Sequence, residues 1–365
     1  MIVYIFKRLL LLIPTLIGIT LVTFFVMKLA PGDPVMLQLR FANPNISPEA
    51  LAAELQKKTS PVELSPGYLH FSAAAAHFVS GKTAAEDLQQ TLTYQGLHWI
   101  GENTVYYLKW LSKIVRLDFG LSYKDKQPVM TKILEALPVT LTINFCTIFV
   151  VYLVSVPLGI WSAIHKGETL DKIIMVKLFL LYSLPTFWVA TMLLTFFAGG
   201  EYFNLFPLMG LHSDDYETLG FWARLGDTAW HLVLPVLADT LGSFAFLARF
   251  TRGNFLDVIQ QDYIRTARAK GLSETTVLFK HGLRNALIPF VTLAGTLLPA
   301  LLGGSVIIEQ IFSIPGMGML SFEAVLGRDH NVIMGITTIS AFLTLLSLFL
   351  TDILYTVVDP RIDLK

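Results

Sequence analysis

Six apolar runs, each long enough to cross a lipid bilayer, limit what this chain can fold into. They lie at about residues 9–27, 137–164, 173–198, 231–250, 287–312 and 332–357. About 20 apolar residues in a helix span the roughly 30 Å hydrocarbon core of a bilayer. Lipid offers no hydrogen bonds, so each run is expected to be a helix that satisfies its own backbone. The sequence therefore predicts an all-α membrane protein with six transmembrane helices.

Composition agrees with this fold class. Hydrophobic residues make up 54% of the chain and charged residues 15%, whereas soluble domains carry about 25% charged residues. The formal net charge is zero, so the overall balance does not favour nucleic acid as a partner. The single cysteine, Cys146, lies in an apolar run, which excludes disulfides and cysteine metal sites; no metal site is expected.

Three parts follow from the spacing of the runs. Residues 1–29 form the N-terminus and the first span, which is expected to be retained rather than cleaved because no small-x-small site follows it. Residues 30–136 lack a membrane-length run and predict a sizeable loop or small domain between helices 1 and 2. Residues 137–365 hold the other five spans. Helices are expected in the loop at 48–58, 83–92 and 102–117.

Basic residues in the short loops predict the orientation. Cytoplasmic loops carry an excess of Lys and Arg, whereas long loops translocate with little regard to charge. One side collects Lys7, Arg8, Lys166, Lys172, Arg249, Arg252, Arg361 and Lys365, with further basic residues between 262 and 289. The other side's short loops carry only Arg224 and Arg328. Both termini are therefore expected in the cytoplasm and the 30–136 insertion outside.

A basic, polar island at 262–289 lies between the fourth and fifth spans, within a predicted cytoplasmic loop at 253–286. As a helix, it places Tyr263, Ala267, Lys270 and Gly271 on one face. Gly271 suits the left-handed position that ends a helix, and Ser273 suits the cap of a second one. Helix, glycine break and helix is the shape of a finger that inserts into a partner. A plain basic loop at an anionic membrane surface is the alternative.

The residues of this island resemble the coupling loop of ABC importer permeases of the dipeptide and oligopeptide type. Residues 263–271 (YIRTARAKG) and 281–289 (HGLRNALIP) carry the likeness. Further matching motifs occur in order at 30–34 (APGDP), 118–123 (DFGLSY), 137–141 (LPVTL), 157–159 (PLG), 183–188 (SLPTFW), 231–235 (HLVLP), 248–252 (ARFTR), 309–318 (EQIFSIPGMG), 328–329 (RD) and 359–362 (DPRI). Residues 198–208 resemble the sub-branch linked to microcin C and longer peptides. No family motif falls in 43–101.

The resemblance implies six helices of the type I importer permease fold and a role in peptide import. It implies that the coupling helix docks on a cytoplasmic ATPase, with these residues in contact: Asp262, Tyr263, Arg265, Thr266, Ala267, Arg268, Ala269, Lys270, Gly271 and Leu272. The segment 273–289 would then carry the motion back to the fifth span. No catalytic residue is implied, because the chain has no phosphate-binding loop of the G-x-x-x-x-G-K-[ST] kind.

Partners and location follow from the same resemblance. The chain would work with a second homologous permease subunit, two cytoplasmic ABC ATPase subunits and an extracytoplasmic substrate-binding protein. It would bind no cofactor of its own, since ATP and Mg²⁺ would be used by the ATPases. Membrane lipid is expected around it, and nucleic acid is not expected as a partner. The expected location is the bacterial inner (plasma) membrane, with several spans.

Two acidic residues inside predicted spans are candidates for the translocation path or its gate. Asp239 lies in the fourth span, where a carboxylate costs about 2.5–3.5 kcal/mol on insertion scales. It either faces the path, where it would meet a peptide amino terminus, or pairs with a partner helix or a wet cavity. Glu309 lies late in the fifth span and is expected at the outer mouth, in a structural or gating role.

Other function classes lack their sequence signatures. An intramembrane protease would need paired aspartates on facing spans with a supporting motif, a Ser/His pair or H-E-x-x-H, and none is present. A stand-alone secondary transporter usually shows internal repeats and needs no docking finger. Import of nickel or another small solute by the same family mechanism remains an alternative to peptide import.

Overall fold

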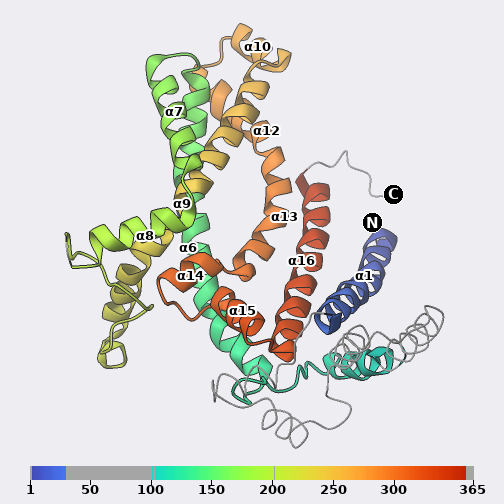
Figure 1. The fold of residues 1–365 in the computed structure, drawn as a ribbon. Coiled ribbons are helices and arrows are strands. Elements are labelled where there is room, and N and C mark those ends of the chain that lie inside the picture. Colours follow the sequence, from blue (N-terminus) through green and yellow to red (C-terminus); the bar gives the residue numbers. More distant parts are fainter. Residues whose placement is uncertain (1, 30–100, 102, 201, 359–365) are drawn as a thin grey trace, which may run out of the picture. The chain divides into compact units, whose positions relative to one another are not determined.

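The computed structural model describes residues 2–29, 101, 103–200 and 202–358, and this part of the chain is helical (Figure 1). Within those ranges there is no strand, and the only β-type pairing is a single bridge between Leu121 and Pro128. The predicted all-α class is confirmed. The expected helix at 102–117 is observed at 103–114, while those expected at 48–58 and 83–92 lie outside the described residues.

Contacts divide the chain into two compact units. The first comprises Met1–Arg8, Glu135–Leu320 and Leu343–Lys365, and the second comprises Leu9–Leu134 and Ser321–Phe342. Both expected pathway residues and the basic island belong to the first unit.

Among the helices of the described residues, four are long and apolar enough to cross a membrane. They are α1 (Ile2–Leu29), α6 (Val129–Ile164), α9 (Phe221–Ile259) and α16 (His330–Val358). The longest, α9, has 39 residues and is about 58 Å long at 1.5 Å per residue. A helix of this length exceeds the bilayer core, so part of it must stand outside the lipid.

The third expected span is two helices. α7 (Thr169–Ser183) and α8 (Thr186–Phe197) are bent by 94° at a short break that contains Pro185. Proline has no backbone N–H and disfavours helical geometry in the residue before it, which here is the extended Leu184. Both helices pack on α9. Neither is long enough to cross a bilayer alone, and only the two together have the length and apolar composition of one span.

The fifth expected span is also interrupted. α13 (Ile288–Gly303) ends at Gly304, whose φ of 64° is left-handed, and α14 (Val306–Ile311) begins after Ser305. Two of the carbonyl groups left open at the end of α13 are satisfied from α6: the Asn144 amide donates to Ala300 O at 2.8 Å and to Leu301 O at 2.9 Å. A short helix, α15 (Met317–Leu326), precedes α16.

Within the first unit, α6 and α9 approach closely at Gly159. A Cβ at this position would lie 2.6 Å from the Ala248 carbonyl oxygen and 2.6 Å from the Thr251 Cβ. Such distances are below any ordinary contact, so only glycine fits unless a backbone shifts. In the same way, Gly335 of α16 fits against Val129 in the second unit, where a Cβ would lie 2.7 Å from the valine Cγ1.

We expect Gly159→Ala to destabilise the protein, because the added methyl meets backbone rather than a movable side chain. Overpacking of this kind costs about 1–3 kcal/mol, against a gain of roughly 0.5–1 kcal/mol from replacing a helical glycine. The apparent melting temperature in detergent should fall. Gly242→Ala in α9 is the matched control, since nothing lies within 4 Å of its added Cβ, and its melting temperature should hold or rise. A Gly159→Ala protein as stable as the Gly242→Ala protein would contradict the close approach.

Candidate functional site: a basic hairpin and three buried carboxylates

The basic island forms a helical hairpin. α10 (Asp262–Ala269) is followed by Gly271, which has a φ of 75°, and by a returning helical segment that begins at Glu274. The Ser273 hydroxyl accepts the Thr276 N–H at 3.4 Å and caps this second segment. The predicted helix, glycine break and serine cap are therefore all observed.

An apolar cluster and a hydrogen bond hold α10 on the returning segment. Ile264 and Val277 are fully buried and, with the nearly buried Ala267, form a small apolar cluster. The Asn285 amide donates to the Tyr263 hydroxyl at 2.8 Å, 22 residues away in the chain. The hairpin is therefore a folded element of its own and not a loose loop.

A charged pair closes the hairpin at the glycine turn. The Arg268 guanidinium donates to both carboxylate oxygens of Glu274, at 2.6 Å and 3.1 Å. The guanidinium holds the pKa of the Glu274 carboxyl below its usual value, and the carboxylate raises the pKa of Arg268. Both groups are therefore charged at neutral pH, and the pair is fixed in geometry because it is bidentate.

The structure divides the predicted contact residues between two faces. Ala267 points into the hairpin's own core, at 7% exposure, whereas Tyr263 and Lys270, which were expected on the same helix face, are exposed. The other nine predicted residues are exposed: Asp262, Tyr263, Arg265, Thr266, Arg268, Ala269, Lys270, Gly271 and Leu272. Of the small residues, Ala269 and Gly271 are the ones a partner could reach.

The returning segment is helical from Glu274 to Ala286 and is separated from α13 by a turn at Leu287. It runs through α11 (Glu274–Thr276), a π-helical stretch η2 (Val277–Leu283) and α12 (Arg284–Ala286) before α13 begins. Leu278 and Ala286 pack with Ile160 of α6 and Phe255 of α9 in one buried cluster. The hairpin thus rests on the ends of two long helices, in addition to leading into α13.

Glu309 lies in a closed pocket of backbone. Its carboxylate is 1% exposed and accepts the Thr140 hydroxyl at 2.9 Å and the Met319 N–H at 2.8 Å. Glycines surround it, because a Cβ at Gly304 or Gly316 would lie 2.7 Å or 2.6 Å from a carboxylate oxygen. This geometry explains the spacing of the 309–318 motif. In this conformation Glu309 anchors the α14–α15 turn and does not line an open path.

Asp239 occupies a different environment. It lies on α9 between Ala238 and Thr240, which are both buried, and is itself partly exposed. Among the described residues, no lysine, arginine or histidine forms an ion pair with it. No hydrogen bond or ion pair between described residues links Asp239 to Glu309, whose partners are Thr140 and Met319.

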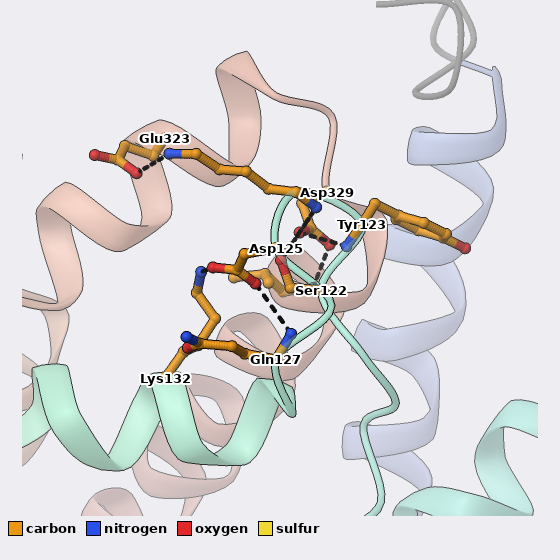
Figure 2. Close-up of polar contacts among 9 residues, drawn as sticks. Ser122, Tyr123, Asp125, Gln127, Lys132, Glu323 and Asp329 are labelled. Carbon is orange, nitrogen blue, oxygen red and sulfur yellow. Dashed lines mark hydrogen bonds and ion pairs between the residues drawn. The ribbon is translucent and has the colours of Figure 1, made fainter. Parts of the chain in front are cut away.

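Two motifs that are far apart in the sequence meet in the second unit. Figure 2 shows Asp329, which caps the start of α16, next to Ser122 and Tyr123 of the loop that precedes α6. The Asp329 carboxylate is 2% exposed. One of its oxygens accepts the Ser122 hydroxyl at 2.6 Å and the Tyr123 N–H at 2.8 Å. The 118–123 and 328–329 motifs thus make one structural site.

Ion pairs extend this site along its exposed edges. The Lys124 ammonium lies 2.7 Å from the Glu323 carboxylate of α15, and Asp125 pairs with Lys132 of α6 (Figure 2). The bond to Lys132 helps to lower the pKa of the Asp125 carboxyl, against a burial effect that raises it. The loop before α6 is therefore tied to α15, α16 and the first turn of α6.

Sequence reasoning missed the structural roles of Asp329, Asp171 and Arg252. Asp329 was noted only as part of a motif, Arg252 only as a basic residue and motif member, and Asp171 was not singled out. The available signal was their location: each lies beside a predicted membrane boundary, where an acidic or basic residue that is buried needs a partner.

The long apolar helices make this chain a multi-pass membrane protein. It belongs to the family described as "Binding-protein-dependent transport system inner membrane component", whose model matches residues 155–364. This membership confirms the resemblance carried by the sequence motifs.

Three curated relatives match along essentially the whole length. The chain is 36% identical over 370 residues to the inner membrane ABC transporter permease protein YejB of Escherichia coli O157:H7, covering 99% of each chain. It is 37% identical over 361 residues to the oligopeptide transport system permease protein AppB of Bacillus subtilis, covering 99% of each. It is 33% identical over 381 residues to the dipeptide transport system permease protein DppB of Escherichia coli K12, covering 100% of each. The chain is thus a permease subunit and not an enzyme.

We expect Asp329→Asn to loosen the loop before α6. An amide keeps one acceptor oxygen but turns an NH₂ group toward donors, and a buried hydrogen bond lost in this way costs about 1–3 kcal/mol. Hydrogen exchange of the Tyr123 and Lys124 amides should accelerate about tenfold or more. Asp118→Asn is the control, because Asp118 is exposed and accepts the N–H of Gly120 in the same loop. Equal exchange in the two variants would show that Asp329 does not hold the loop.

Proposed function

We propose that this chain forms half of the translocation path of an ATP-driven importer of peptides. The observation that carries the proposal is full-length similarity to three permease proteins, two of them named for oligopeptide or dipeptide transport. A binding protein outside the membrane would deliver the peptide, a second permease would complete the path, and separate ATPase subunits would supply the energy. Nickel or another small solute is the alternative cargo within the same family mechanism.

In this proposal the chain crosses the inner membrane six times, with both termini in the cytoplasm and the 30–136 insertion outside. The bent third span supports the count. Asp171 of α7 contacts Arg252 of α9, and α8 shares a buried cluster with α9 from Leu232 onward. These α9 positions are 252 − 232 = 20 residues apart, or about 30 Å, which matches the bilayer core. This spacing supports the proposal that α7 and α8 together form one bent span.

The termini support the same topology. The Arg8 guanidinium, near the start of α1, lies 2.9 Å from the Asp352 carboxylate near the end of α16. The start of the first span and the end of the last span therefore lie on the same side, as an even number of spans requires.

The hairpin at 262–286 is proposed to receive the ATPase. Its exposed face offers charged side chains around Ala269 and Gly271, and its internal cluster keeps its shape fixed before docking. A preformed element of this kind loses little conformational entropy on binding. Ala267 would then act by holding α10 in place, while Glu309 would fix the gate region from within.

The complete system tests the function. When the chain is purified with the products of its neighbouring genes, it should carry a second permease and ATPase subunits. Proteoliposomes containing the complex and its binding protein should accumulate labelled tripeptide only when ATP is supplied. A chain that purifies without ATPases and moves tripeptide without ATP would overturn the importer assignment, and ATP-dependent uptake of nickel in place of peptide would overturn the cargo.

We expect Ala269→Trp to uncouple transport without unfolding the hairpin. The side chain at this position is exposed on α10, so a bulky ring would obstruct a partner's groove and leave the internal cluster intact. Peptide uptake should fall at least about tenfold, while the amount of chain in the membrane stays the same. Lys166→Trp, in an exposed loop on the same proposed side, is the control and should transport normally. Uptake at the wild-type rate by the Ala269→Trp protein would show that α10 is not the docking element.

We expect Asp239→Asn to weaken uptake selectively. If this carboxylate meets a peptide's charged amino terminus, losing a charge-assisted bond worth about 1.5–3 kcal/mol should lower uptake of free tripeptides about tenfold or more. Uptake of N-acetylated tripeptides should not change. Asp257→Asn, at an exposed position of the same helix, serves as the control. An equal loss for both kinds of peptide would assign Asp239 a structural role, and no loss for either would remove it from the path.

A further inference from the structure

An ion pair between a buried carboxylate and a partly exposed arginine joins three helices next to the hairpin. Asp171, in the first turn of α7, is 2% exposed. The Arg252 guanidinium of α9 donates to both of its carboxylate oxygens, with Nη2 at 2.9 Å and Nε at 3.2 Å. Ser162 of α6 donates its hydroxyl to Asp171 and accepts the Arg252 Nε–H at 3.0 Å. Ser162, Asp171 and Arg252 are referred to below as the α6–α7–α9 clamp.

The clamp also fixes the loop between α6 and α7. Gly167, with a φ of 89°, donates its N–H to Asp171 at 3.0 Å. The carboxylate therefore accepts hydrogen bonds from a side chain on α6, a side chain on α9 and the connecting backbone. A bidentate arginine–carboxylate pair is fixed in angle as well as in distance. These helix ends cannot slide or rotate past one another while the clamp is intact.

Apolar packing connects the clamp to the hairpin. Phe255 and Leu256 follow Arg252 by one turn of α9 and are buried in a cluster with Ile160 of α6. The hairpin contributes Leu278 and Ala286 to that cluster. Gly282 of the hairpin also faces the Phe255 ring: a Cβ at this position would be in ordinary contact with the ring, at 3.6 Å. Clamp and hairpin thus share one packed layer.

We propose that the α6–α7–α9 clamp is the positioning element that makes these three helix ends move as one body with the hairpin. Movement received at α10 is then delivered to α6, α7 and α9 together, and not to the fifth span alone. This inference rests on the proposed function, because it assigns how the hairpin acts on the membrane helices. Ser162, Asp171 and Arg252 touch neither the partner nor the peptide and act through the helices they join.

The test compares three versions of the chain. Asp171→Asn combined with Arg252→Gln removes both charges at once and so leaves no buried charge without its partner. Asp171→Arg combined with Arg252→Asp restores a pair with reversed signs. Arg224→Gln removes the ion pair of α9 with the exposed Glu217 and is the matched control. If the neutral double variant fails to insert, Ser162→Ala keeps the ion pair and should give the same effects at smaller size.

The first measurement is hydrogen exchange of the purified chain in nanodiscs. The neutral double variant should exchange about tenfold faster both at 165–172 and in the hairpin at 277–286, whereas Arg224→Gln should match the wild type at both. Faster exchange at 165–172 with an unchanged hairpin would overturn the proposal, because the clamp would then order only its own loop. This measurement needs neither partners nor peptide, so it stands even if the proposed cargo proves wrong.

The second measurement is the number of ATP molecules hydrolysed per tripeptide imported by the reconstituted complex. The neutral double variant should raise this ratio about fivefold or more at an unchanged level of assembled complex. The reversed pair should bring the ratio back to within about twofold of the wild type. An unchanged ratio in the neutral variant would overturn the proposal. A wild-type complex that imports no tripeptide would count against the proposed function, and hydrogen exchange alone would then decide the role of the clamp.

Discussion

Three carboxylates that are shut away from solvent hold the places where this helical chain changes direction. Asp171, Glu309 and Asp329 are 2%, 1% and 2% exposed. Each accepts a backbone N–H, from a loop at Asp171 and Asp329 and from the first turn of α15 at Glu309, as well as a hydroxyl from another segment. Neutral donors surround Glu309 and Asp329, and Arg252 completes the set at Asp171. A buried charge is tolerated only where such donors converge. These hydrogen bonds therefore fix the backbone geometry at each turn, and with it the angle between the helices that the turn joins.

The same requirement explains how two spans can be interrupted. A helix break exposes carbonyl and N–H groups that lipid cannot satisfy. At the end of α13 the Asn144 amide donates hydrogen bonds to two of the carbonyls, and Ser305 caps the start of α14. Glycine at 304, 316 and 318 leaves the space that the Glu309 carboxylate fills. The motif around Glu309 is thus a set of steric and hydrogen-bonding requirements at one break, and its spacing follows from geometry.

The sequence predicts much of this structure, and the reasons for its failures are physical. Long apolar runs predicted α1, α6, α9 and α16, and the glycine and serine of the hairpin predicted its turn and cap. Spacing on a helix placed Ala267 on an outer face, yet the returning segment covers it, since periodicity does not say which side a neighbour will occupy. The break at Pro185 has a local cause in the proline, whereas the break at Gly304 also relies on Asn144 of α6, which no local pattern connects to it. The links from Asp329 to Ser122, and from Asp171 to Arg252, join residues 207 and 81 positions apart, which local patterns do not reveal.

The length of α9 gives the chain a mechanical property. At about 58 Å, it is nearly twice as long as a bilayer core is thick, and its described residues form one continuous helix through Pro235. A rod that is held by lipid near its middle behaves as a lever: a tilt of about 10° displaces its two ends by roughly 5 Å in opposite directions. A tilt imposed on α9 at one face of the membrane would therefore also move its end at the other face, because the two ends belong to one continuous helix.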